Sequence, residues 1–197
     1  MNPTHSKRER LTAAAATLVH QKGFSNTTLA DVAEMAKLPL GGIYYYFKTK
    51  DALAEAVTER RVSDIDALLE KLDRLPTPRA RLKALVNVWA EDREIDALYG
   101  CPIGSLCYEL AKGRGPLSTV ASRLFTHLLA WSEAQFGLAG FTRKQAKTHA
   151  LHLISALQGI SLVANALGDS DAILSETRFL TGWLDTLSRT QKNGGHA

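Results

Sequence analysis

Two tyrosines and two lysines near the N-terminus have the clearest capacity for chemistry in this sequence. Phenol hydroxyls and ammonium groups donate hydrogen bonds to phosphates, and small residues at the leading end of a helix let its backbone approach a groove. The sequence places such small residues just before the tyrosines. This pattern indicates contact with a polyanion such as DNA. The residues concerned are Gly41, Gly42, Tyr44, Tyr45, Lys48 and Lys50.

The distribution of charge supports a polyanionic partner at one end of the chain. The 197 residues carry a formal net charge of +4. Residues 1–50 contain seven basic and three acidic side chains, an excess of four that accounts for the whole net charge. Clustered basic side chains neutralise phosphates. A protein that packages DNA without specificity would instead spread them widely, so the neutral remainder argues against that class.

Local signals predict short helices that position these side chains. Apolar residues at helical spacing predict a first helix that ends at Gly23. Thr28 with Asp31 makes a capping box for a second helix, and Pro39 breaks the chain after it. Two short helices, separated by a break of three or four residues and following a basic first helix, are the layout of a helix-turn-helix.

A third short helix is expected over residues 40–47, with Thr49 capping a long fourth helix that continues towards residue 72. Leu40, Ile43 and Phe47 share one face and are expected to pack inward. The glycines and Tyr44 and Tyr45 then lie towards the outside. The alternative for these tyrosines is a small aromatic core.

The segments Thr27–Ala33 and Gly41–Leu53 resemble the signature of the TetR family of transcriptional regulators. The resemblance covers residues 7 to about 55. It implies a recognition helix over residues 40–47 and a Thr28 that caps its helix and approaches the DNA backbone. Together with the residues, it gives the following candidate DNA-binding set: Thr28, Lys37, Leu40, Gly41, Gly42, Tyr44, Tyr45, Lys48 and Lys50.

Three positions depart from the family pattern. Lys37 stands where the family usually has Gly, Pro39 where it has Ser, and Gly42 where it has Ser or Thr. Gly42 lacks a hydroxyl that commonly faces DNA, so the resemblance implies how the protein docks but not which bases it reads.

The resemblance also implies the organisation of the whole chain. It predicts a DNA-binding domain over residues 1–53 and a ligand-binding and dimerisation domain over 54–190. The polar composition after Arg189 predicts a disordered tail over 191–197. The expected protein is a homodimeric repressor that a small-molecule inducer releases from double-stranded operator DNA. We expect neither enzymatic activity nor a cofactor or metal. Because no signal peptide is apparent, we expect it to be cytoplasmic.

The rest of the chain is also predicted to be helical, so the fold class is all-α. Pro76 and Pro78 make a stiff break. Beyond them, periodicity predicts helices at roughly 78–97, 104–112, 117–137, 142–167 and 171–190.

A second motif, Gly100–Glu109, resembles a pattern in TetR branches that respond to xenobiotics or small reactive compounds. Such a joint borders the ligand cavity in those branches. Cys101 would lie near a helix N-terminus, which stabilises a thiolate and raises its reactivity; the alternative is a buried, inert thiol. The candidate ligand-binding residues are Trp89, Tyr99, Cys101, Leu106, Phe125 and Trp131, each of which could instead be ordinary core.

The last two predicted helices indicate a dimer. Apolar residues occur all round the helix over residues 150–167, more than one face inside a monomer can use. The final helix repeats apolar positions at the spacing of a packing seam, so two helices from each subunit would form a four-helix bundle. The candidate interface residues are Leu153, Leu157, Ile160, Ala164, Ile173, Leu180, Leu184 and Leu187.

Three other interpretations receive less support. An enzyme could use Cys101 or Cys107 as a nucleophile beside Glu109, but no histidine lies close in sequence and no phosphate-cradling loop is present. His149 and His152 are spaced to share a metal, yet no carboxylate or thiol accompanies them. Residues 148–168 carry no formal charge, but polar side chains recur through them, which favours burial among protein partners over a membrane.

Overall fold

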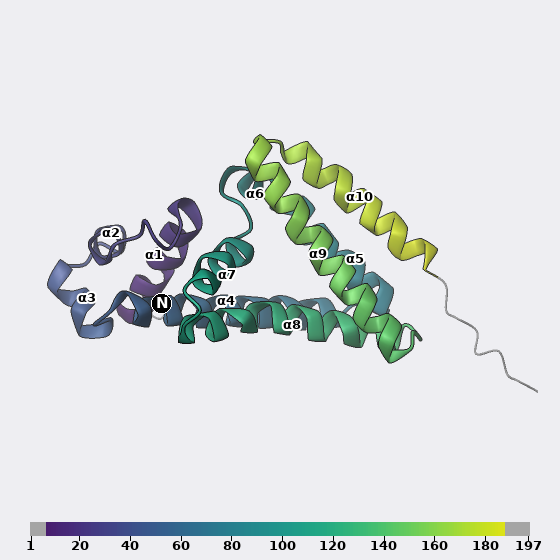
Figure 1. Ribbon diagram of the computed structural model, residues 1–197, viewed down its shortest axis with the longest axis horizontal. Helices are drawn as coiled ribbons and strands as arrows, with labels where there is room; N and C mark the ends of the chain where they lie inside the picture. The colour runs from purple at the N-terminus through teal and green to yellow at the C-terminus, as the bar shows by residue number, and fades with distance from the viewer. Residues whose placement is uncertain (1–6, 188–197) are drawn as a thin grey trace, which may run out of the picture. The chain divides into compact units, whose positions relative to one another are not determined.

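A computed structural model of the chain describes residues 7–187, and this part is helical with no strand (Figure 1). The all-α prediction is confirmed. The tail predicted over 191–197 lies outside the described residues. The helices are α1 (Lys7–Lys22), α2 (Leu29–Met35), α3 (Leu40–Tyr46), α4 (Lys50–Asp73), α5 (Pro78–Glu91), α6 (Arg93–Tyr99), α7 (Pro102–Lys112), α8 (Pro116–Leu138), α9 (Arg143–Leu167) and α10 (Ser170–Thr186).

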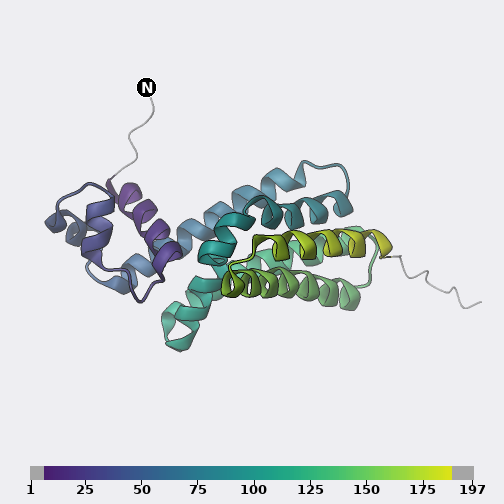
Figure 2. The same ribbon diagram turned by 90° about the horizontal axis from the view of Figure 1, so that it is seen from above.

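The described residues form two compact units. Unit 1 contains residues 7–67 and 98–127, and unit 2 contains residues 68–97 and 128–187. In unit 1, α1 packs against α2 and α7, and α2 packs against α3. In unit 2, α10 packs against α5 and α9, which lie beside it in both views (Figures 1 and 2). The association of α7 with the N-terminal helices was not anticipated from the sequence, and the domain boundary predicted at residue 53 stays a prediction.

The local signals for the helix-turn-helix are confirmed. Gly23 follows α1 with a φ of +84°, a conformation that favours glycine. The Asp31 N–H donates to Thr28 Oγ1 at 3.1 Å, and the Thr28 N–H donates to Asp31 Oδ2 at 2.9 Å, which completes the capping box. Thr49 Oγ1 accepts from the Ala52 N–H at 3.1 Å, so it caps α4 as predicted.

The single helix predicted over residues 78–97 is wrong. α5 ends at Glu91, and the chain continues through Asp92 into the separate helix α6. The Asp92 N–H still donates to the Val88 carbonyl, but the Asp92 backbone leaves helical geometry at φ −92° and ψ 6°. No glycine or proline marks this break, so apolar periodicity could not reveal it.

The inward face predicted for α3 is only partly correct. Ile43 and Phe47 are buried, but Leu40 is 48% exposed. α3 has seven residues, and Leu40 is the first of them, directly after the capping Pro39. A helix this short reaches the core with its later turn, so its first residue stays at the surface.

Most of the predicted dimer-interface residues lie in the core of unit 2. The spacing does describe a packing seam, but the helices of the same chain fill it, because α10 packs on α5 and α9. A side chain with almost no accessible surface offers little area to a second subunit, and the part that these residues play in a dimer stays a prediction. Ile160 and Leu187 remain partly exposed. The buried members are Leu153, Leu157, Ala164, Ile173, Leu180 and Leu184.

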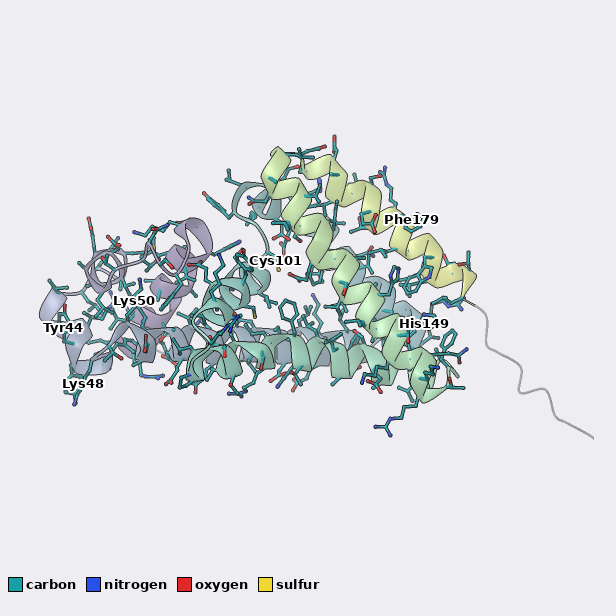
Figure 3. The ribbon with its side chains drawn as sticks, in the orientation of Figure 1. Tyr44, Lys48, Lys50, Cys101, His149 and Phe179 are labelled. Carbon is teal, nitrogen blue, oxygen red and sulfur yellow. The ribbon has the colours of Figure 1, made fainter. Side chains whose placement is uncertain are left out.

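The exposed apolar side chains of α9 and α10 are different residues. On α9 they lie on the side away from the buried positions. On α10, Phe179, which is labelled in Figure 3, is 67% exposed. α9 is also long and apolar enough to cross a membrane by length and composition alone, a test that the core helix of a globular protein also passes. The exposed residues are Leu151, Leu162, Val163, Leu167 and Phe179.

Candidate nucleic-acid interface

The outer face of α3 presents large polar-tipped side chains at the surface of unit 1. Tyr45 is 82% exposed and Tyr44 is 52% exposed, and Figure 3 places Tyr44 and Lys48 at the outer edge of α3. A Cβ built on Gly41 or Gly42 meets nothing within 4 Å. The packing of the chain therefore does not require these glycines, and their absent side chains leave room beside the helix for something outside it.

Three other predicted DNA-binding residues are also exposed in unit 1. Thr28 and Lys48 are exposed, as is Lys37 in the turn between α2 and α3. Lys37 has a φ of +54°, a left-handed conformation that favours glycine. Lys37 adopts this strained conformation in the tight turn that connects α2 to α3, and the two helices pack together.

Part of the basic charge of the N-terminal segment holds the helix-turn-helix together. Arg10 donates to the Ala36 carbonyl at 2.7 Å and so ties α1 to the end of α2. Arg8 lies over the Phe47 ring, 5.5 Å from its centroid. Sequence reasoning missed both roles, because a carbonyl or a ring face leaves no signature in residue spacing.

Lys22 and Asp31 form a further pair that links α1 to α2. Lys22 Nζ lies 2.6 Å from Asp31 Oδ2. The hydrogen bond from Lys22 and those from Thr28 lower the pKa of Asp31 to about 2. Both side chains are exposed, so the pair fixes orientation more than it stabilises the fold.

Lys50, a predicted DNA-binding residue, is partly exposed and bonds within the protein. Its Nζ donates to the Ser25 carbonyl at 2.8 Å and lies 4.7 Å from the centroid of the Phe24 ring. From α7, the Glu109 carboxylate accepts the N–H groups of Phe24 and Ser25, each at 2.9 Å. The turn between α1 and α2 is thus held by two oppositely charged side chains.

The six predicted ligand-binding residues are divided between the two units. Tyr99, Cys101, Leu106 and Phe125 belong to unit 1, and Trp89 and Trp131 belong to unit 2. Cys101, Leu106 and Trp89 are buried. The Trp131 indole donates to Asp73 Oδ1 at 3.0 Å. Their role in binding a ligand stays a prediction.

A buried polar network lies in the core of unit 2. Trp89 Nε1 donates to Ser161 Oγ at 3.0 Å, and Ser161 Oγ lies 3.1 Å from Asp96 Oδ2 and 3.0 Å from the Leu157 carbonyl oxygen. Burial raises the pKa of Asp96 to about 6, and the nearby charge of Asp92 adds to the shift. The single hydroxyl proton of Ser161 can be donated to the Asp96 carboxyl group or to the Leu157 carbonyl oxygen.

The two cysteines are both buried and are not joined by a disulfide. Cys107 Sγ donates to the Ala121 carbonyl at 3.2 Å, and burial raises the pKa of its thiol to about 12. Cys101 is the N-cap residue of α7, which agrees with the predicted position at a helix N-terminus. Cys107 is therefore an inert core thiol, whereas the reactivity predicted for Cys101 stays a prediction.

His149 packs among aromatic rings in unit 2. Its ring centroid lies 5.0 Å from that of Phe141, 5.4 Å from that of Phe136 and 5.7 Å from that of Trp183. Burial, and to a lesser extent His152, lower the pKa of His149. A neutral imidazole packed on rings accounts for this residue without a metal.

Two family models match the chain. The model described as bacterial regulatory proteins of the tetR family matches residues 11–57, the segment that contains α2, α3 and their exposed face. The model described as the C-terminal domain of LmrA/YxaF-like transcriptional regulators matches residues 78–177. The chain belongs to the TetR family. It is a DNA-binding transcriptional regulator with a helix-turn-helix, and not an enzyme.

Relatives of this TetR-family protein carry regulator names. An uncharacterized HTH-type transcriptional regulator in the lacX 3′ region of Lactococcus lactis is 27% identical over 175 residues, which cover 85% of this chain and 88% of that protein. The HTH-type transcriptional regulator BetI of Burkholderia thailandensis is 34% identical over 93 residues. That match spans 46% of this chain and about half, 48%, of BetI.

Solved structures share the TetR-family fold along almost the entire chain. A TetR transcriptional regulator from Legionella pneumophila superposes with a TM-score of 0.83 at 20% identity, covering 93% of this chain and 99% of that one. The reduced form of NemR from E. coli gives a TM-score of 0.75 at 20% identity, covering 90% and 96%.

Proposed function

We propose that this TetR-family regulator is a cytoplasmic repressor that binds its operator as a homodimer and leaves it when a small-molecule inducer binds. The exposed face of α3 carries the proposal for DNA. It combines two exposed tyrosines with two glycines whose missing side chains leave space next to the helix. Hydroxyl and ammonium groups there can reach phosphates while the backbone approaches the groove.

The proposed contacts divide into two kinds. Side chains at the rim, such as Lys48 and Thr28, would bind phosphates and fix the register of the protein on the duplex. The first turn of α3, with its glycines, would approach the base edges. The proposed DNA-binding residues are Thr28, Lys37, Leu40, Gly41, Gly42, Tyr44, Tyr45, Lys48 and Lys50.

A second copy of the chain is the proposed partner for the exposed faces of α9 and α10. Leu162 is 71% exposed and Phe179 is 67% exposed. Glycines lie close to each of them, Gly159 on α9 and Gly182 on α10, and a Cβ added at either meets nothing within 4 Å. Large apolar side chains beside such gaps suit close packing of two helix pairs related by a two-fold axis.

The proposed inducer site draws on the second sequence motif. Cys101 and Leu106 lie at the start of α7, the helix whose far end contacts the helix-turn-helix. A small molecule that contacts these residues, together with Tyr99 or Phe125, could shift α7. Trp89 and Trp131, which belong to unit 2, stay separate candidates for ligand binding.

A gel-shift series with the DNA upstream of the protein's own gene tests this function. The expected result is a discrete complex that survives excess unrelated DNA. The complex should disappear when an inducer is added, chosen from the small molecules on which the products of the flanking genes act. Binding that unrelated DNA competes away equally would contradict sequence-specific regulation. Binding that strengthens with every effective small molecule would contradict repression relieved by an inducer.

A further inference from the structure

The turn between α1 and α2 is fixed by groups that are distant in sequence. Glu109 Oε1 accepts the Phe24 N–H, and Glu109 Oε2 accepts the Ser25 N–H, each at 2.9 Å. Lys50 Nζ donates to the Ser25 carbonyl oxygen at 2.8 Å. The backbone of Ser25 is therefore held at its N–H by an anion and at its C=O by a cation. We refer to Glu109, Lys50 and the Phe24–Ser25 backbone as the turn clamp.

The turn is shaped to receive this carboxylate. Gly23 has a φ of +84°, which directs the next N–H groups to one side, and such consecutive donors form an anion-binding nest. A Cβ at Gly23 would lie 2.9 Å from Glu109 Oε1, closer than a Cβ atom approaches a non-bonded heavy atom in proteins. Both the conformation and the free space at Gly23 are thus needed for the carboxylate to reach the turn.

The position of Glu109 is not one that its own helix favours. It lies in the last turn of α7, where the partial negative charge of the helix terminus opposes a carboxylate. The half-buried side chain is instead stabilised by the two hydrogen bonds from the turn, which a formal charge strengthens. What Glu109 stabilises is therefore the docking of α7 on the DNA-binding helices.

A second contact joins α1 to the other end of α7. His20 Nε2 lies 2.7 Å from the Gly100 carbonyl oxygen, and because a carbonyl only accepts, Nε2 carries the proton of this hydrogen bond. The His20 ring also meets the Tyr99 ring edge-on, with centroids 5.7 Å apart. α7 is thus anchored to the end of α1 both before its first turn and in its last turn.

We propose that Glu109 is a positioning residue for operator binding. The inference rests on the proposed function of α3. Because the clamped turn leads directly into the capping box at Thr28, it sets where α2 begins and therefore where α3 lies. By accepting the N–H groups of Phe24 and Ser25, the Glu109 carboxylate holds the helix-turn-helix in the orientation that fits an operator.

The direction in which one substitution changes operator affinity distinguishes a positioning role of Glu109 from a purely electrostatic one. Glu109→Gln keeps the size of the side chain but replaces one acceptor oxygen by a donor, which cannot pair with a backbone N–H. It also makes the protein more positive by one charge, which by itself strengthens attraction to DNA phosphates. Positioning predicts weaker operator binding, and a purely electrostatic role predicts tighter binding.

The test uses the full-length protein as wild type, Glu109→Gln and the matched control Glu70→Gln, which makes the same change at an exposed position of α4. Fluorescence anisotropy measures the affinity for an upstream operator fragment and for unrelated DNA. We expect Glu109→Gln to weaken operator binding about tenfold, the size of one charge-assisted hydrogen bond. Unrelated DNA should bind all three proteins within about twofold.

Amide hydrogen exchange distinguishes a local loosening of the turn from a general loss of stability, which would speed exchange throughout the protein. In Glu109→Gln, the Phe24 and Ser25 amides should exchange faster, while the amides in the middle of α5 and α9 keep their wild-type rates. Should Glu109→Gln fail to fold, Glu109→Asp retains the charge but is too short to reach both N–H groups, and the same loss of operator affinity is expected.

The outcomes separate this inference from the proposed function. Wild-type protein that binds no upstream DNA specifically would contradict the proposed function. Specific wild-type binding that Glu109→Gln retains at full strength, with unchanged exchange of Phe24 and Ser25, would overturn the turn clamp alone. Equal losses for operator and unrelated DNA would also overturn it, because a positioning residue affects the specific fit.

Discussion

The exposed faces of α3 and α9 are both rich in large side chains, but their chemistry differs. The tyrosines of α3 end in hydroxyl groups and stand beside Lys48. The leucines exposed on α9 lie in a stretch, residues 148–168, without a formal charge. A face of hydroxyl and ammonium groups suits a hydrated polyanion, whereas an uncharged apolar face suits the dry centre of a protein interface.

The cores behind these faces differ in the same sense. Behind α3, charged side chains such as Arg10 and Glu109 bond to backbone groups and so fix the orientation of short helices. Behind α9, the core is mostly apolar, with a few buried polar side chains that include the Trp89–Ser161–Asp96 network. The first region is thus held by directional bonds and the second by burial, and each can be broken by a different kind of substitution.

The largest expected effect is the loss of the dimer. Leu162→Glu places a charge on the exposed apolar face of α9, where desolvating it would oppose association. The protein should become monomeric by light scattering. Its operator affinity should fall by roughly 10²- to 10⁴-fold, because two linked recognition helices bind at high effective concentration.

Leu98→Glu is the matched control for this charge, since Leu98 is similarly exposed, at 64%, but lies on α6. It should leave the dimer intact. A Leu162→Glu protein that remains dimeric would show that the exposed face of α9 is not the subunit interface.

A substitution on the buried face of α9 should change the stability of the protein and leave its assembly intact. Leu157 has no accessible surface, so Leu157→Ala should lower the free energy of unfolding by about 2–5 kcal/mol through lost contacts and a cavity. Urea unfolding measures this, with Leu98→Ala as an exposed control expected to cost below about 0.5 kcal/mol. Equal costs for the two variants would contradict the assignment of Leu157 to the core.

The buried carboxyl of unit 2 predicts a pH dependence. Because the pKa of Asp96 is raised from 3.8 to about 6 in the folded state, its stabilising effect is complete below about pH 4 and is lost as the pH rises through 6. Asp96→Asn mimics the protonated form. It should be more stable than wild type at pH 7.5 by up to about 3 kcal/mol, and the difference should vanish near pH 4. A difference that is constant between pH 4 and 7.5 would show that Asp96 does not titrate in this range.

The smallest expected effect concerns the rim of the DNA-binding face. Lys48→Ala should weaken binding to all DNA sequences several-fold and reduce the dependence of log K on log salt by about 0.9 per subunit. Lys71→Ala, on an exposed part of α4, should leave the slope unchanged. An affinity loss confined to one DNA sequence would mean that Lys48 contacts a base and not a phosphate.

The elements of the helix-turn-helix were predictable because their signals are local. Thr28 and Asp31 cap α2 across three residues, and Gly23 ends α1 at the next position in the chain. The break at Asp92 carries no such signal. The turn clamp was also unpredictable, since Glu109 is 85 residues from Phe24 and its partners are backbone N–H groups, which every residue other than proline possesses.

The face of α9 that contacts solvent could not be read from the sequence either. Apolar residues occur all round this helix, so periodicity identifies it as a packing helix without showing which side its own chain covers. The predicted positions, such as Leu153 and Leu157, are covered by neighbouring helices of the same unit. The exposed positions became apparent only from the burial of each side chain.

A footprint of the purified protein on its operator tests the central claim most directly, namely that two α3 helices related by a two-fold axis read DNA. We expect two protected half-sites of inverted sequence, with centres about one helical turn, roughly 34–36 Å, apart. The complex should contain an even number of protein chains. A single unpaired half-site at saturating protein, bound by one chain, would contradict the account.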